Sequence, residues 1–285
     1  QGELRAFAAL PSNQRIDPMK SLLSTLVLTT ALTMPGLAMA RQVTLTTNLK
    51  TYGGDDRVSD LGGTDKVNLG AGDDYVRVGG GKDSYDGGTG VDYISYYQSS
   101  GGVTLDLKAN TATGSWANND TVKNFESASG SNTGGDLLKG TDGYNDLRGY
   151  GGDDNLQGKG GNDLLQGGKG DDKLYGASGA DTLYGGSGED FLDGGGGSGT
   201  DRLCGDSGDD VFHFDRGEGN DRVMDFENND DTIEFDNFSY LTTVADAIGF
   251  AEEVGPHVFF DFGADGTLLV ENTTINRLLN DIDIV

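Results

Sequence analysis

Residues 140–193 consist of six consecutive nonapeptides, GTDGYNDLR, GYGGDDNLQ, GKGGNDLLQ, GGKGDDKLY, GASGADTLY and GGSGEDFLD, with no insertion between them. Each is a variant of G-G-x-G-x-D-x-U-x, in which U is a large apolar residue. The eighth position is leucine in all six, and the sixth is aspartate in all but the first, which has Asn145. A repeat this regular predicts a fold built from stacked nine-residue units.

The composition of the repeat predicts its local structure. Its first six, glycine-rich positions favour a turn with backbone dihedrals that other residues avoid. The x-U-x that follows predicts a short strand with one side chain pointing inward. Two repeats then make one coil, and stacked coils place the eighth-position residues in an interior row. Asp154, Asp172 and Asp190 are expected along one edge and Asp163 and Asp181 along the other. The predicted fold class is an all-β parallel solenoid.

The acidic turns predict a cation site. Calcium binds six to eight oxygen atoms from carboxylates and backbone carbonyls, and a gap between stacked turns supplies both. The chain has a net charge of −27, 49 glycines and only 34% hydrophobic residues. Disordered and halophilic proteins can share such a composition, but the strict register favours a polyvalent cation site. Because stacked carboxylates repel one another without a cation, we expect several calcium ions to be part of the fold.

The net charge and the single cysteine exclude other classes of protein. A chain this acidic is not expected to bind nucleic acid or an anionic membrane by charge, and long apolar helices for membrane insertion are absent from the sequence. Cys204 is the only cysteine, so a disulfide within the chain cannot form. We expect Cys204 to be a buried small residue in a monomer; a disulfide between two copies is the alternative.

The N-terminal region has the pattern of an export signal. Residues 19–40, MKSLLSTLVLTTALTMPGLAMA, have a short positive start, an apolar run, a Pro-Gly break and an A-x-A site. This predicts a Sec signal peptide cleaved before Arg41, because the apolar run is shorter than the roughly 20 residues that span a bilayer. A membrane anchor or a core helix is the alternative. We expect a secreted, extracellular or periplasmic protein, and interpret residues 1–18, upstream of the first methionine, as an extension that is not native.

A first repeat block is predicted at residues 41–95. After a strand with alternating Val43 and Leu45, nonapeptides run in register from Thr51. The fifth, GGTGVDYIS, matches the full motif, whereas the first two lack one or both leading glycines. The eighth positions of this block are Val58, Val67, Val76, Tyr85 and Ile94.

Residues 96–135, the inserted segment, leave the nonapeptide pattern. They include an alternating strand at residues 103–107 and a polar turn at 118–120. The simpler interpretation, which we favour, is an excursion inserted into one continuous solenoid. The alternative is a linker between two rolls, or a binding surface that carries three aromatic residues, Tyr96, Tyr97 and Trp116.

The main repeat block is predicted at residues 136–222 and a C-terminal cap at residues 223–285. After residue 193 the repeat loses strict register: an eleven-residue copy contains Asp201, another repeat contains Asp210, and a degenerate copy contains Asp221. Glycine then becomes rare and apolar residues become frequent, which predicts strands that close the last coil, as a solenoid requires. A short helix is expected at residues 244–253 and a hairpin turn at 264–266.

The predicted metal ligands are the residues at the sixth position of each repeat, or at its equivalent. They are Asp56, Asp65, Asp74, Asp83, Asp92, Asp136, Asn145, Asp154, Asp163, Asp172, Asp181, Asp190, Asp201, Asp210 and Asp221. Asn145 offers an amide oxygen without a charge, so we expect weaker binding at its turn. Calcium is the only cofactor predicted.

From about Thr51 to the C-terminus the chain resembles the RTX, or haemolysin-type, calcium-binding proteins, because the nonapeptide recurs in register many times. The resemblance implies a right-handed parallel β-roll in which sixth-position aspartates and turn carbonyls bind calcium between alternate turns. It also implies a closing region at residues 210–238, and residues 280–285 are similar to the acidic-then-apolar tail of type I secretion substrates. Most members lack a Sec signal, so the export route stays open between Sec and type I.

The sequence carries no catalytic motif that we recognise. Its two histidines, His213 and His257, are not part of H-E-x-x-H, and G-x-S-x-G is absent. The GDSGD at residues 205–209 is similar to a serine-protease sequence, but it is a repeat turn, and no histidine precedes it. The DFGADG at residues 261–266 begins like an EF-hand loop, but its twelfth position is Asn272. The numerous carboxylate pairs are explained as calcium ligands.

The sequence therefore predicts a secreted calcium-binding β-roll protein with a structural or binding role and no catalysis. Calcium is scarce in the cytosol and abundant outside, so its binding free energy would drive folding after export. One alternative is an accessory or degenerate protein that acts on an extracellular polysaccharide such as alginate. Another is a fragment of an adhesin or of a biofilm matrix protein.

Overall fold

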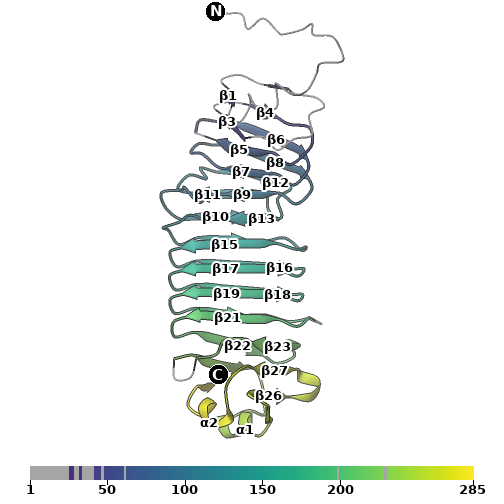
Figure 1. Cartoon of the computed structure of the whole chain (residues 1–285), viewed down its shortest axis with the longest axis vertical. Helices are drawn as coiled ribbons and strands as arrows, with labels where there is room; N and C mark the ends of the chain where they lie inside the picture. Colours follow the sequence, from purple (N-terminus) through teal and green to yellow (C-terminus); the bar gives the residue numbers. More distant parts are fainter. Residues whose placement is uncertain are drawn as a thin grey trace, which may run out of the picture.

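The computed structural model is an elongated stack of coils (Figure 1). It describes residues 26–28, 32–33, 42–45, 48–60, 62–197, 199–227 and 230–285. The extension predicted at residues 1–18 lies outside the described residues, as does most of the predicted signal peptide. Among the residues described, no helix has the length and apolar character needed to cross a membrane.

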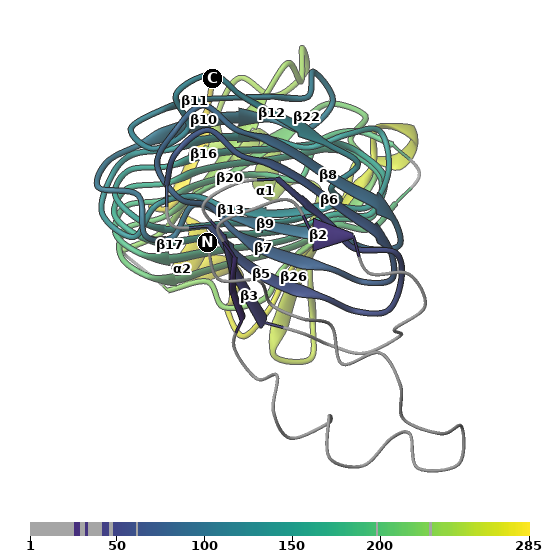
Figure 2. The same ribbon diagram turned by 90° about the horizontal axis from the view of Figure 1, so that it is seen from above.

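Two mainly parallel sheets face each other along the stack, and the chain alternates between them (Figures 1 and 2). Sheet A contains, in spatial order, β1 (Leu26–Leu28), β3 (Gln42–Leu45), β5 (Arg57–Asp60), β7 (Tyr75–Arg77), β9 (Tyr93–Ser95), β13 (Ser127–Ser129), β15 (Asp146–Gly151), β17 (Leu164–Lys169), β19 (Thr182–Ser187), β21 (Arg202–Ser207), β23 (Asn220–Val223), β27 (Thr267–Val270), β26 (His257–Asp261) and β25 (Ala251–Val254). Sheet B contains β2 (Leu32–Thr33), β4 (Leu49–Lys50), β6 (Lys66–Ala71), β8 (Ser84–Thr89), β12 (Asp120–Lys123), β11 (Thr111–Gly114), β10 (Val103–Asp106), β14 (Leu137–Lys139), β16 (Asn155–Gly160), β18 (Lys173–Ser178), β20 (Phe191–Asp193), β22 (Val211–Asp215), β24 (Thr232–Asp236) and β28 (Ile282–Ile284).

The pairing register confirms the predicted coil of two nonapeptides. β15 pairs with β17 in parallel so that Leu147 lies opposite Leu165, and β16 pairs with β18 so that Leu156 lies opposite Leu174. The eighth-position leucines of the main repeat block are 0% exposed. Because each packs beside its equivalent in the next coil, the core is a narrow apolar row between the sheets rather than a thick globular interior.

The inserted segment contributes three strands to sheet B and one, β13, to sheet A. β10, β11 and β12 form an antiparallel meander, with β12 parallel to β8 and β10 parallel to β14. In sheet A, β13 pairs directly with both β9 and β15, so this sheet runs without interruption from the first repeat block into the main repeat block. Since neighbouring strands lie about 4.8 Å apart, two additional strands lengthen sheet B by about 10 Å at this level. The coils of the first repeat block are accordingly tilted against those of the main repeat block (Figure 1).

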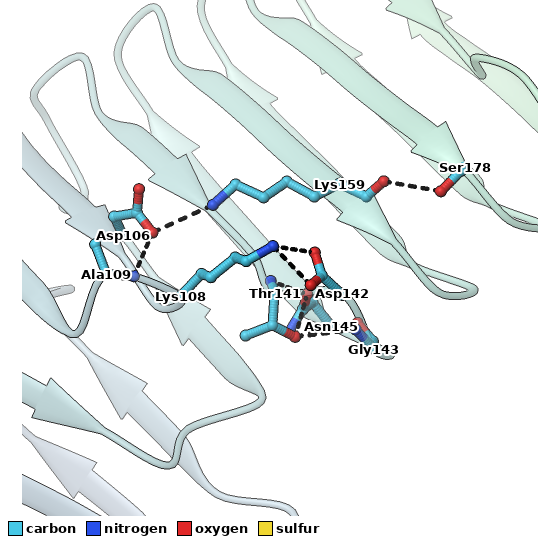
Figure 3. A network of polar contacts seen from close by, with 9 residues as sticks. All are labelled: Asp106, Lys108, Ala109, Thr141, Asp142, Gly143, Asn145, Lys159 and Ser178. Atoms are coloured by element: carbon cyan, nitrogen blue, oxygen red, sulfur yellow. Dashed lines mark hydrogen bonds and ion pairs between the residues drawn. The ribbon is translucent and has the colours of Figure 1, made fainter.

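Two lysine contacts join the inserted segment to the main repeat block (Figure 3). Lys108 Nζ lies 2.5 Å from Asp142 Oδ1, and Lys159 Nζ lies 3.2 Å from Asp106 Oδ1. The Lys108–Asp142 pair is mostly exposed to solvent, so we expect it to orient the inserted segment while contributing little to stability.

The C-terminal cap closes the last coil. β25, β26 and β27 form an antiparallel meander at the end of sheet A, and β27 is parallel to β23. The short helices α1 (Val244–Ile248) and α2 (Ile275–Leu278) lie at the same end (Figure 1). The ring of Phe235 lies 5.8 Å from that of Phe238 and 5.5 Å from that of Phe260, measured between centroids. This aromatic cluster covers the end of the interior row, which a solenoid must shield from water.

The structure confirms the predicted fold class and its β-rich cap, and it corrects two local predictions. The helix expected at residues 244–253 ends at Ile248, because the chain then enters β25. Tyr96, suggested above as part of a binding surface, is 0% exposed and belongs to the core. The expected hairpin joins β26 to β27 through a 3-10 turn, η1 (Gly263–Asp265). The domain boundaries remain predictions.

Candidate metal centre

The predicted metal ligands line both edges of the stack, where turns from successive coils meet. All of them are buried, with at most 6% of the residue exposed. One row contains Asp56, Asp74, Asp92, Asn145, Asp163, Asp181, Asp201 and Asp221. The other row contains Asp65, Asp83, Asp136, Asp154, Asp172, Asp190 and Asp210.

In most of these aspartates one carboxylate oxygen holds neighbouring coils together. Within a row, Oδ1 accepts a hydrogen bond from the backbone N–H of the aspartate one coil earlier. The N–H of Asp154 donates to Asp172 Oδ1 at 2.7 Å, and the N–H of Asp163 donates to Asp181 Oδ1 at 2.6 Å. The carboxylates therefore serve the fold even before any metal is considered.

The second carboxylate oxygen has no protein partner at many of the turns. Oδ2 is buried without a hydrogen bond in Asp74, Asp92, Asp154, Asp163, Asp172, Asp181 and Asp190. A buried carboxylate oxygen that lacks a hydrogen bond or a counter-charge is costly in free energy. Repeated along both rows, it indicates a partner that the chain itself does not supply.

The first-position glycines allow these oxygens to approach the backbone closely, and we call the group of oxygen atoms at each such turn the glycine pocket. A Cβ on Gly149 would lie 2.1 Å from Asp154 Oδ2 and 2.7 Å from the carbonyl oxygen of Gly167. A Cβ on Gly167 would lie 2.3 Å from Asp172 Oδ2 and 2.6 Å from the carbonyl oxygen of Gly185. Each pocket is thus lined by a carboxylate oxygen from one coil and a carbonyl oxygen from the next. This donor set fits calcium, which takes oxygen ligands of both kinds.

The rows also hold protons unusually tightly. Burial raises the pKa of Asp154 to about 8, and the charges of Asp136 and Asp172 raise it further against the opposing hydrogen bond from a backbone N–H. Burial likewise raises the pKa of Asp163 to about 7 and that of Asp172 to about 7. A bound divalent cation would favour the ionised carboxylates, so protons and cations are expected to compete for the same rows.

The first repeat block differs from the main repeat block at the first position of the repeat. There the main block has glycine, whereas the first block has the buried residues Thr51, Asp60, Leu69 and Val78 before it returns to glycine at Gly87. Because a first-position Cβ points at the sixth-position carboxylate of the same turn, these side chains occupy the direction in which a glycine pocket would open.

Three acidic residues outside the predicted set extend the rows. The N–H of Asp83 donates to Asp120 Oδ1 at 2.8 Å, that of Asp92 to Glu126 Oε2 at 2.9 Å, and that of Asp210 to Asp231 Oδ1 at 3.1 Å. Asp120 and Asp231 each precede a buried apolar residue by two positions, as in the repeat, so this spacing alone could have identified them. Glu126 is followed only by a small alanine at that position and gives a weaker signal.

Two predicted ligands, Asn145 and Asp136, lie in the rows, but their side-chain oxygens accept hydrogen bonds from the protein backbone. Asn145 Oδ1 accepts from the N–H of Thr141 at 2.7 Å, a contact drawn in Figure 3, and its Nδ2 donates to the carbonyl of Glu126 at 2.8 Å. Asp136 accepts from the N–H of Val103 at Oδ1 and from that of Ser131 at Oδ2. Their turns therefore differ from those with a vacant second oxygen, and the ligand roles of both residues remain predictions.

The single cysteine lies beside one of the rows. Cys204 is buried, as expected from the sequence, and its Sγ lies 2.9 Å from Asp225 Oδ2. Burial and the neighbouring carboxylate raise the pKa of the thiol, so it stays protonated at neutral pH. A protonated thiol is a poor nucleophile.

Comparison with known proteins agrees with the geometry of the turns. The family model for the RTX calcium-binding nonapeptide repeat matches residues 50–85, 61–94, 131–165, 157–192, 166–200 and 195–212. No curated protein matches the sequence. Among solved structures, the extracellular lipase LipA from Serratia marcescens is similar at 16% identity and a TM-score of 0.37, over 89% of this chain and 41% of the lipase. The repeat and the acidic rows it builds show that this chain belongs to the RTX calcium-binding nonapeptide-repeat family.

Proposed function

We propose that this protein is a secreted β-roll whose folding is driven by calcium after export, with a structural or binding role and no catalysis. The observation that carries the proposal is the repeated glycine pocket, in which a buried, unpartnered Asp Oδ2 faces a carbonyl oxygen of the next coil. A cation in each pocket would supply the missing partner. Multiple ions are proposed because the arrangement recurs along both rows.

The energetics of the turns support coupling between metal binding and folding. Without a cation, buried carboxylates within a row raise the free energy of the folded state, and the many glycines lose more backbone entropy on folding than other residues do. A ligand that binds only the folded chain adds its binding free energy to stability. External calcium would therefore complete a fold that the chain cannot hold well by itself.

Circular dichroism during a calcium titration of the chain tests this proposal. We expect a cooperative change from coil to β spectrum between sub-millimolar and millimolar calcium. Magnesium should not reproduce it, because magnesium demands a small octahedral site and gives up its waters reluctantly. A full β spectrum and a cooperative melt in chelator would contradict calcium-driven folding.

A second candidate function, binding of an acidic extracellular polysaccharide, is favoured by one surface. On sheet A the rings of Tyr75 and Tyr93 stack at 5.4 Å, Arg57 lies over Tyr75 at 5.2 Å, and Arg148 lies over Tyr93 at 6.0 Å. Stacked aromatic rings flanked by guanidinium groups suit sugar rings that carry carboxylates. Arg148 already pairs with Asp146 at 2.7 Å, so Arg57 is the guanidinium group that would meet a sugar carboxylate.

A glycan array probed in calcium tests the second candidate. Tyr75→Ala should weaken binding to a uronate polymer by about 3- to 10-fold, the range expected for loss of one aromatic contact. Tyr184→Ala, on the same sheet in the main repeat block, is the matched control and should bind as the parent does. Trp116→Ala separately tests the inserted segment. The absence of any calcium-dependent glycan signal would remove this candidate.

A further inference from the structure

Asp60 lies at the first position of its repeat, where the main repeat block has glycine, and it is not among the ligands that the repeat predicts. It is 4% exposed, and its carboxylate lies with those of Asp65 and Asp83. One carboxylate oxygen from each of these three residues falls within 4.8 Å of the others. Three buried carboxylates converge here, whereas an ordinary glycine pocket has the single carboxylate oxygen of its own turn beside a carbonyl oxygen.

The hydrogen bonds around these carboxylates leave one of them without a partner. Tyr85 Oη donates to Asp60 Oδ2 at 2.6 Å and lies 3.2 Å from Asp83 Oδ2, and the N–H of Gly62 donates to Asp60 Oδ1 at 3.1 Å. Asp83 Oδ1 accepts from the N–H of Asp65 at 2.7 Å. Both side-chain oxygens of Asp65, which is only 3% exposed, are buried without a hydrogen bond.

The charges of the three carboxylates are not balanced by the protein. In the part of the chain that the structure describes, no lysine, arginine or histidine forms an ion pair with Asp60, Asp65 or Asp83. The Tyr85 hydroxyl supplies one proton to be shared between two of the carboxylates, and Asp65 receives none of it. Like charges held together in a buried site require a cation or a proton.

We propose that Asp60, Asp65 and Asp83 form a distinct divalent-cation site of the first repeat block, in which Asp60 is a ligand that the nonapeptide does not encode. The site would take a hard cation of the calcium class, because all of its donors are oxygens. More carboxylates per ion raise calcium affinity, so this site would fill at lower calcium concentration than the glycine pockets. The inference rests on the proposed function, that acidic turns of this chain hold calcium.

The test is the number of calcium ions bound per chain, measured by equilibrium dialysis and metal analysis on the full chain. Asp60→Leu should bind one ion fewer at saturating calcium. The neighbouring repeat already carries Leu69 at this position, so the fold accommodates leucine there. Asp60→Asn should retain the ion but bind it about tenfold more weakly, since a neutral amide replaces a charged ligand. Asp73→Asn, an exposed aspartate of the same block, removes the same charge outside the site and should leave number and affinity unchanged.

Asp163→Ala, in a glycine pocket of the main repeat block, separates this inference from the proposed function. If Asp163→Ala loses an ion and Asp60→Leu keeps the full number, the site at Asp60 is overturned while the proposed function stands. If the parent chain binds no calcium, the proposed function itself has failed. If Asp60→Leu does not reach the parent β spectrum in calcium, Asp60→Asn decides. An unchanged affinity then overturns the site, and a weaker one supports it.

Discussion

The two repeat blocks share one period and one hydrogen-bond ladder, yet they build different interiors at the edges of the stack. In the main repeat block, glycine at the first position allows a carboxylate oxygen and a carbonyl oxygen to lie close to the backbone, as at Gly149 and Asp154. In the first repeat block, Leu69 and Val78 fill the same position with buried apolar side chains. The ladder of Asp Oδ1 contacts continues through both blocks. The nine-residue period thus determines the coil. The residue at the first position of each repeat determines whether that turn holds a glycine pocket or a buried apolar side chain.

This difference implies that the blocks draw on different sources of stability. Each fully buried leucine or valine stabilises the folded state by about 1.5–3 kcal/mol. Apolar packing would therefore stabilise the first repeat block, whereas bound cations would stabilise the main repeat block. Solenoid stability is approximately a sum over repeats and their interfaces. One end of a solenoid can therefore stay ordered while the other opens.

Removal of calcium should give the largest effect. In chelator, backbone amides of residues 140–193 should exchange with solvent at least about tenfold faster than those of residues 51–95, because 1.4 kcal/mol is a factor of ten and only the first block has apolar first positions. Hydrogen exchange followed by mass spectrometry measures this. Equal loss of protection in both blocks would show that the different first-position residues do not change the stability of the two blocks.

A change of pH should have the second-largest effect, on the stability of the metal-free main repeat block. Its folded aspartates have a raised pKa, about 8 for Asp154 and about 7 for Asp163 and Asp172, against about 3.9 in the unfolded chain. The folded state therefore binds more protons between these values. The stability this provides is fully present below about pH 4 and is lost as pH rises toward 8.

Thermal melts across this pH range, with and without calcium, check the sign. In chelator the melting temperature should fall as pH rises from 4 to 8. In calcium it should rise over the same range, because ionised carboxylates bind the metal. A melting temperature in chelator that increases with pH would mean that the aspartates are not buried as the structure shows.

Gly167→Leu would convert one turn of the main repeat block into a turn of the first-block type. Its Cβ would lie 2.3 Å from Asp172 Oδ2, so the chain should bind at least one calcium ion fewer. Overpacking should cost about 1–3 kcal/mol in addition. Calcium counting and chemical denaturation measure the two effects. Gly196→Ala is the matched control, because a Cβ there meets nothing within 4 Å; equal behaviour of the two variants would refute the pocket.

Lys108→Ala should give the smallest effect. It removes the exposed ion pair with Asp142 between the inserted segment and the main repeat block, and exposed pairs contribute about 0–1 kcal/mol. Urea denaturation in calcium would measure the change, and calcium binding should be unaltered. A loss well above this range would mean that the junction between the blocks stabilises both of them.

Much of the candidate site could be predicted from the sequence because the repeat is local. The spacing of aspartates and leucines placed Asp154, Asp163 and Asp172 in buried rows, and the structure shows them there. Prediction from the spacing failed where the nonapeptide pattern is interrupted. Asp120 continues a row within the inserted segment. Its place there depends on the pairing of β12 with β8, which the periodicity of the sequence does not predict.

The sequence by itself determined the coil, since glycine-rich turns and one inward apolar residue per nonapeptide are properties of nine consecutive residues. It also determined that calcium is the cation to expect, because the turns offer only oxygen ligands. Only the tertiary structure decided that one strand of the inserted segment, β13, continues sheet A while sheet B gains additional strands. It also decided that Asp60 meets Asp65 and Asp83. The physical reason is that strand pairing and the convergence of buried charges join residues of different coils, and local periodicity carries no information about where an interrupted chain rejoins the stack.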